Sequence, residues 1–438
     1  MNVGAINSRS SSSAPIISLW LLWFFLIFGP VLDSPAGQFG DISFLVAGCL
    51  ALRCFYIKLN PIFIYSLFFL SGICILALST AIISDWDVID VAVRAVLRPI
   101  KAAIFLLGVV SLTELTISYY VRLNNVSSRE IFYKVIEMIF YCIVLHALIM
   151  VLQFLVPSFK DFIYSLTMAK YQLEHYQFFR MAGLSGGGGA QVSVVQSLGF
   201  LLGFSLLRQK QSHLTIILAQ LLIIMSIFLS GRSGFLTVVL VVLFYFVLSL
   251  LFLIYSSRIV LSFSRLVLYF CLFGLFVFFI TYLLQTNDYF IVAFERTFDT
   301  LINYRQSGEV SDNTLVALGE MFVLPAELTH LLFGRASFLE NNTFYNINTD
   351  IGYFRLIWGY GFLGLFLHVL VYVLFSIVAF KVYLHDRGVA YLCFVMLILI
   401  FLFNAKEIFF FTRMSFQISF SVICAAYYAF LTAKSRGF

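Results

Sequence analysis

The chain has 438 residues, of which 62% are hydrophobic and 11% are charged, and its mean hydropathy is +1.02. This balance excludes a water-soluble globular protein and predicts an integral membrane protein. The net charge of +6 does not indicate a nucleic-acid partner, because much of the basic excess lies in short loops, where it sets membrane orientation. The seven cysteines lie inside apolar stretches, so we predict no disulfide, no metal site and no cofactor.

Apolar stretches that are long enough to cross a membrane recur along the whole chain. A hydrocarbon core about 30 Å thick requires about 20 apolar helical residues, and helices satisfy the backbone hydrogen bonds there. The sequence therefore predicts an all-α polytopic membrane protein, a single integral membrane domain over residues 1–438 with about twelve spans. The predicted spans cover residues 16–32, 41–57, 62–83, 102–120, 131–156, 190–207, 214–230, 234–255, 266–284, 351–380, 389–404 and 408–432.

The basic residues between these spans predict the orientation of the chain. With the N-terminus in the cytoplasm, most connecting Lys and Arg side chains also fall in the cytoplasm, as the positive-inside rule requires. These residues are Lys58, Arg122, Arg129, Arg208, Lys210, Arg258, Arg265, Lys381, Arg387, Lys434 and Arg436. Both termini are then cytoplasmic, and the two long loops, 157–189 and 285–350, lie on the opposite side. Loops of this length on one side suggest a region that handles something large there.

The first long loop ends with an arginine and a run of glycines. Arg180 and Gly183 precede four consecutive glycines, 186–189, and the next span follows directly. A guanidinium offers a fixed fork of donors to phosphate, and glycines let backbone N–H groups approach an anion closely. The segment therefore predicts an anion cradle. A flexible linker is the alternative interpretation.

Residues 230–234, with the sequence SGRSG, form the whole connection between two apolar runs on the same outer side. A tight hairpin needs the glycines but does not need Arg232. An arginine on an outer turn runs against the positive-inside trend and is costly if it is drawn into the membrane. We therefore predict a functional role for Arg232.

The second long loop is mainly acidic and contains three candidate proton acceptors, His330, Glu320 and Asp350. Carboxylates and amides suit the binding of sugars, although any exposed loop needs polar residues to remain solvated. Residues 315–324 and 328–333 are apolar enough to form short amphipathic helices that lie on the membrane or cover a cavity.

Four charged residues precede the fourth predicted span. Asp90, Arg94, Arg98 and Lys101 are spaced by four, four and three residues, which places them on one face of a helix. We interpret this face as one that pairs with lipid head groups or within itself.

Together these features resemble the bacterial O-antigen polymerases of the Wzy type, which are related to the O-antigen ligases. Besides the span pattern, the resemblance rests on Arg180, Gly183, the turn 231–233, residues 350–353, and Gly359, Gly361 and Gly364. It implies a GT-C-like fold in the bacterial inner membrane with a periplasmic active face. It also implies a glycosyltransferase that polymerises undecaprenyl-diphosphate-linked oligosaccharide repeat units into O-antigen or a related surface polysaccharide.

That reaction assigns roles to the residues above. A diphosphate leaving group needs cationic donors at the membrane surface, and Arg180 and Arg232 are the candidates. Gly183 is expected to bind the diphosphate beside them. A base must take the proton of the acceptor hydroxyl, and the three candidate proton acceptors of the second loop could do so. A metal ion is not required if the arginines carry the diphosphate charge.

The expected partners are the lipid-linked oligosaccharide, the bilayer, a chain-length regulator and a flippase, and not a nucleic acid. One alternative is an O-antigen ligase, which transfers finished polysaccharide to lipid A core and uses the same kind of donor. Another is a lipid-linked oligosaccharide flippase or other transporter, which would also have many spans. The long outer loops and the scarcity of charge in most central spans favour the enzyme.

Overall fold

The structure is a computed structural model. It describes residues 14–33, 40–57, 59–83, 89–123, 126–169, 180–185, 189–207, 209, 213–255, 274, 277–278, 280–288, 290–292, 294–295, 298, 305, 321–336, 349 and 351–432. The regular elements within these residues are helices, apart from two isolated β-bridges that join Val31 to Asp41 and Leu32 to Thr167. The predicted all-α class is confirmed.

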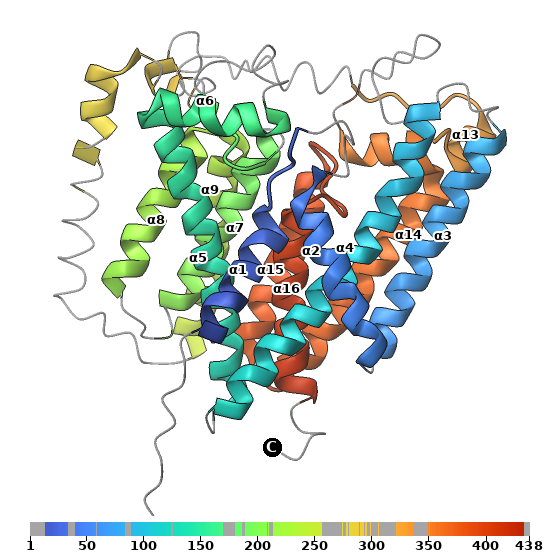
Figure 1. Ribbon diagram of the computed structural model, residues 1–438, viewed down its shortest axis with the longest axis horizontal. Helices are drawn as coiled ribbons and strands as arrows, with labels where there is room; N and C mark the ends of the chain where they lie inside the picture. The colour runs from blue at the N-terminus through green and yellow to red at the C-terminus, as the bar shows by residue number, and fades with distance from the viewer. Residues whose placement is uncertain are drawn as a thin grey trace, which may run out of the picture.

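The helices pack side by side as a bundle (Figure 1). In chain order they are α1 (Ala14–Phe28), α2 (Ile42–Leu52), the 3-10 turn η2 (Arg53–Tyr56), α3 (Pro61–Ile83), α4 (Ile89–Leu123), α5 (Ser128–Leu155), α6 (Pro157–Leu166), α7 (Ala190–Leu207), α8 (His213–Phe228), α9 (Arg232–Tyr255), α13 (Leu328–Phe333), α14 (Gly352–Tyr383), α15 (Arg387–Asn404), α16 (Ser415–Tyr427) and η4 (Tyr428–Thr432).

Six of the described helices are long and apolar enough to cross a membrane, and the chain is therefore a multi-pass membrane protein. They are Pro61–Ile83, Val93–Arg122, Ser128–Leu155, Ala190–Leu207, Gly352–Tyr383 and Arg387–Asn404. Five shorter apolar helices lie between or beside them, within α1, α2 with η2, α8, α9 and α16 with η4. Most of the predicted span 266–284 lies outside the described residues, so the count of twelve spans stays a prediction.

The centre of the bundle is α16, shown in red in Figure 1. Every residue of α16 is buried, whereas α3 exposes large apolar side chains such as Phe68 and Ile75 on its outer face. A helix that is buried on every side belongs inside a bundle, and outward apolar faces suit contact with lipid. The predicted span 408–432 is wrong at its start, because residues 405–414 form a loop and α16 begins at Ser415.

Helix α14 is interrupted at Gly361, where φ is 67° and ψ is −177°. A positive φ favours glycine, which has no Cβ atom. A Cβ atom at this position would also clash with the carbonyl oxygen of Leu332. The break frees carbonyl groups of the preceding turn, and the loop after α13 supplies donors to them. Arg335 N donates to Trp358 O at 2.8 Å, and Ala336 N donates to Gly359 O at 3.0 Å. The predicted span 351–380 is thus two helical pieces.

The helix α13 confirms one of the two predicted amphipathic helices, at Leu328–Phe333. The other, at 315–324, lies mostly outside the described residues, and residues 322–324 are not helical. Both α6 and α13 lie at the same end of the bundle, which we call the loop end (Figure 1). Backbone bonds join further segments there, since Ile42 N donates to Pro30 O at 3.0 Å and Met168 N donates to Val31 O at 2.9 Å.

Candidate anion-binding site

A cavity of about 430 Å³ lies where several helices begin or end at the loop end. Its lining contains five basic and two acidic side chains, which give it a net charge of +3. The charged lining residues are Arg94, Arg98, Lys101, Arg355, Arg413, Asp41 and Glu407, and the other lining residues include Gln191 and Thr412. Such an excess of positive charge in a concave site favours an anionic ligand.

One wall of the cavity is the first part of α4. Its three basic side chains follow helical spacing and line the cavity together, so the predicted common face is confirmed for Arg94, Arg98 and Lys101. Arg98 Nη2 donates to Phe410 O at 3.0 Å and to Thr412 Oγ1 at 3.3 Å, which are both in the loop before α16. The face therefore lines the cavity, and its pairing with lipid head groups or within itself stays a prediction. The side chain of Asp90 lies outside the described residues.

A proline in α4 helps to fix this wall. Pro99 has no N–H group, so the carbonyl of Ala95, four residues earlier, cannot receive its usual helical bond. The hydroxyl of Tyr360 donates to that carbonyl at 2.8 Å instead. This bond holds the first piece of α14 against α4 beside the cavity.

The opposite wall is the loop 405–414, which has a tightly determined backbone. Asn404 Oδ1 accepts from Phe409 N at 2.9 Å and from Phe410 N at 3.3 Å. Phe411 and Met414 have positive φ angles of 54° and 65°, which are unusual for residues other than glycine. Such backbone strain persists where surrounding contacts enforce it, and it is common at functional sites.

Arg413 is held at the cavity by α2. Its Nη2 donates to Ser43 Oγ at 2.8 Å and lies 3.4 Å from Asp41 Oδ1, and only 18% of its side chain is exposed. Asp41 also caps α2, because its carboxylate accepts from Phe44 N at 3.3 Å. Burial lowers the pKa of the Arg413 guanidinium and the charge of Asp41 opposes the shift; an arginine remains cationic. Arg413 Nε is buried and has no hydrogen-bond partner among the described residues.

Arg355 enters the cavity from the first turn of α14. Its Nε donates to Thr349 O at 2.5 Å. Gly352, three residues earlier, lies against the backbone of Glu407 so closely that a Cβ atom would clash with the carbonyl oxygen of Glu407. Residues three apart share a helix face, so Arg355 lies beside the segment that supplies Glu407.

The predicted cradle around Arg180 and Gly183 is packed against the inside of the bundle. Gly183 N donates to Gln153 Oε1 at 3.0 Å, and Gly183 O accepts from Gln153 Nε2 at 2.9 Å. At its φ of 64° a Cβ atom would also clash with the ring of His146. Both backbone groups of Gly183 are thus engaged, and we assign this glycine a structural role in place of anion binding. Arg180 is partly buried, its carbonyl accepts from Tyr164 Oη at 3.4 Å, and it is not on the cavity lining.

The turn at 230–234 lies between the segment 180–183 and the loop 405–414. Met181 N donates to Leu229 O at 2.7 Å, and Lys406 Nζ donates to Ser233 Oγ at 2.6 Å. The structure therefore brings together the segment 180–183 and the turn 230–234, which the sequence singled out. It also connects the turn to Lys406, in the loop that lines the cavity. Arg232 begins α9, and its side chain lies outside the described residues.

The candidate proton acceptors of the second loop are only partly described. His330 lies on α13, with Nδ1 2.8 Å from Glu327 Oε2, and it is not on the cavity lining. Burial and the charge of Arg335 lower the pKa of His330, and Glu327 opposes that shift. Glu320 and Asp350 lie outside the described residues.

No protein-family model, no curated protein and no solved structure matches this chain. The site therefore rests on its own geometry.

Sequence reasoning missed Arg355, Arg413, Asp41 and Glu407. One signal was present, since a charge inside a predicted span is costly unless it is functional, and Arg413 falls inside the predicted span 408–432.

Proposed function

We propose that the protein is a glycosyltransferase of the inner membrane that acts on diphosphate-linked oligosaccharides. The observation that carries the proposal is the cavity of net charge +3 at the loop end. If the loop end faces the periplasm, as the positive-inside rule predicts, these cations lie where connecting segments normally carry few. A binding role for an anion explains their presence.

The chemistry of the lining fits a diphosphate leaving group. Arginine forks bind phosphate oxygens in a bidentate manner, and four of the five basic side chains are arginines, namely Arg94, Arg98, Arg355 and Arg413. When a glycosyl–phosphate bond breaks, negative charge grows on the diphosphate, and pre-positioned cations stabilise it. The strained loop 405–414 and its Asn404 bonds hold Arg413 in place before the ligand arrives.

Within this class we propose the polymerase that the sequence resembles. The growing chain on undecaprenyl diphosphate would be transferred to a hydroxyl of the next lipid-linked repeat unit. The position of the cavity, at the end where apolar helices give way to polar loops, suits a substrate with a lipid tail and a polar head.

The test uses a deletion strain complemented with cavity variants. We expect Arg98→Gln and Arg413→Gln to insert into the membrane but to abolish long polysaccharide chains, because each removes a diphosphate donor. The control is Arg129→Gln, since Arg129 is 54% exposed, pairs with Asp386 and is not on the cavity lining. Normal chain ladders from both cavity variants would contradict the proposal.

The same strain separates the polymerase from the ligase, which would use the cavity in the same way. Loss of the protein should leave single repeat units on the core if it is the polymerase, and bare core if it is the ligase. A purified protein that moves a lipid-linked unit across vesicles, without joining units, would favour the flippase.

A further inference from the structure

Helix α6 has three different faces, although it contains only ten residues. One face packs inward, where Tyr164 is 4% exposed. A second face is polar and exposed, and it carries Asp161 and Ser165. The third face is apolar and exposed, since Phe162 is 58% exposed and Leu166 is 48% exposed. A helix with separate polar and apolar faces, both open to the surroundings, suits a boundary between water and lipid.

The apolar face of α6 continues a stripe of exposed side chains that runs along α5. Four exposed leucines of α5 are spaced by three, four and three residues, so they share one helix face. They are Leu145, Leu148, Leu152 and Leu155. Because α5 is long and apolar enough to cross a membrane, this face suits contact with lipid. Leu155 is the last residue of α5, and the exposed Val156 leads directly into α6.

The chain turns where α5 ends, so α6 does not extend the same span. Val156 is extended, with φ of −126° and ψ of 91°, and Pro157 begins α6. Proline fits the first turn of a helix and disfavours a helical conformation in the residue before it. In Figure 1, α6 runs across the loop end and not along the axis of α5. Its apolar face therefore lies at the end of the membrane-crossing bundle.

We propose that α6 is an interfacial helix and that its partner is the lipid of the leaflet at the loop end. Phe162 and Leu166 enter the boundary between the lipid head groups and the acyl chains, and Asp161 and Ser165 face water. The continuity of this surface with the exposed stripe of α5 favours lipid over a second protein. The inference goes beyond the proposed function and does not depend on glycosyl transfer.

The membrane-bound helix also supports the segments that pack around it. Tyr164 Oη accepts from Ala182 N at 3.1 Å. Beyond α6, Met168 N donates to Val31 O at 2.9 Å. Val31 is joined by a β-bridge to Asp41, which lines the cavity. The helix thus connects the membrane surface with the loops beside the cavity.

The experiment places the photo-crosslinker p-benzoylphenylalanine at single positions of the full-length protein, in nanodiscs of phosphatidylethanolamine and phosphatidylglycerol. At Phe162 and Leu166 we expect lipid adducts on the part of the acyl chain near the glycerol, because interfacial helices lie about 5–10 Å into this boundary. At Asp161 and Ser165, the matched controls on the polar face, the lipid adduct should be lost. Leu148, inside α5, is the positive control and should react nearer the chain end. Mass spectrometry of the adducts measures both yield and position.

Three results would overturn the proposal. If Leu148 forms lipid adducts but Phe162 and Leu166 do not, the apolar face of α6 lies in water. Crosslinks from Phe162 and Leu166 to a polypeptide show that a protein covers the face, and a second copy of this chain is identified by mass. Adducts near the chain end at Asp161 as well as Phe162 show that α6 lies inside the bilayer. Because no readout uses transfer activity, failure of the proposed function would leave this assignment intact.

Discussion

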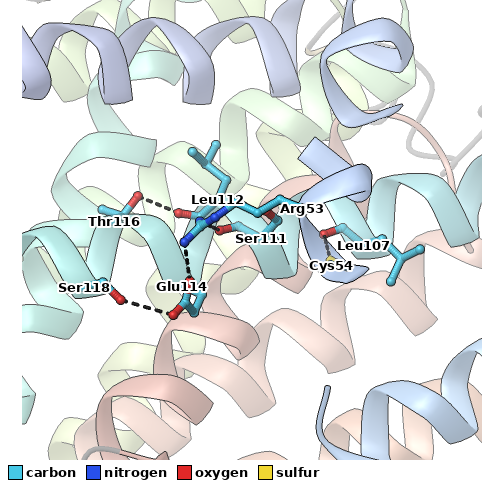
Figure 2. Close-up of polar contacts among 8 residues, drawn as sticks. All are labelled: Arg53, Cys54, Leu107, Ser111, Leu112, Glu114, Thr116 and Ser118. Atoms are coloured by element: carbon cyan, nitrogen blue, oxygen red, sulfur yellow. Dashed lines mark hydrogen bonds and ion pairs between the residues drawn. The ribbon is translucent and has the colours of Figure 1, made fainter. Parts of the chain in front are cut away.

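Two of the groups of charged side chains among the described residues differ in their balance of cations and anions. In the first, Arg53 Nη2 donates to Glu114 Oε2 at 2.8 Å and Arg53 Nη1 donates to Ser111 O at 3.1 Å (Figure 2). The other carboxylate oxygen accepts from Ser118 Oγ at 3.2 Å. One cation meets one anion, and the contacts join η2 to α4.

The second group is the cavity lining at the loop end, where cations exceed anions by three. Arg413 has one carboxylate partner in Asp41, yet its Nε has no hydrogen-bond partner among the described residues. A buried charge is costly unless it is compensated. The difference teaches that the first group is balanced within the protein, whereas the second carries an excess of positive charge that the proposed anionic ligand would balance.

Reversing charge in the cavity should have the largest effect. Because each reversal changes the charge by two, Arg94→Glu with Lys101→Glu takes the lining from +3 to −1. We expect inorganic pyrophosphate to bind on the order of 100-fold more weakly, since like charge replaces attraction. Isothermal titration measures the change. The charge-conserving pair Arg94→Lys with Lys101→Arg is the control. Pyrophosphate binding that survives the charge reversal would show that the positive charge of the cavity does not bind anions, and the contrast between the two groups would be wrong.

Breaking the balanced pair should affect stability and not binding. Glu114→Gln leaves Arg53, whose side chain is 36% exposed, without its ion pair. We expect a loss of about 1–3 kcal/mol in the free energy of unfolding, less than for a fully buried pair. Thermal unfolding in detergent measures it.

The matched variant removes both charges. Arg53→Met with Glu114→Leu should recover most of the lost stability, because an apolar pair can replace a balanced ion pair. Both variants should bind pyrophosphate like wild type. A binding defect in Glu114→Gln would show that the two groups are coupled.

Local sequence patterns predicted the parts of the site that lie on one element. Helical spacing placed Arg94, Arg98 and Lys101 on one face, and the structure confirms it. The pattern could not indicate what faces them, because Arg355 and Arg413 come from segments more than 250 residues away along the chain. Such a juxtaposition depends on tertiary packing.

The unbroken run of apolar residues also prevented the prediction of the loop 405–414, which lines the cavity. Residues 408–411 are Ile and Phe, so they predict the start of a span. In the structure the three Phe rings form aromatic contacts instead, and the ring of Phe411 is stacked on Tyr372 with 5.5 Å between the ring centroids. Gly183 shows a second limit of sequence patterns, because a glycine near an arginine is compatible with an anion cradle, whereas its N–H donates to Gln153 in the structure.

The smallest expected effect concerns a further charged pair, His330 with Glu327, at the loop end. Because burial and Arg335 lower the pKa of His330, the imidazole should titrate below 6.5. The unfolded chain then binds more protons between the two values, so stability falls slightly as the pH drops through this window. NMR of labelled histidine, assigned with His330→Asn, measures the midpoint. Glu327→Gln should lower the pKa further and Arg335→Gln should raise it.

Since Glu327 is 63% exposed, these shifts should be small and should fade in high salt. Because His330 is not on the cavity lining, adding pyrophosphate should leave its midpoint unchanged. A shift of the His330 midpoint on adding pyrophosphate would connect this pair to the cavity.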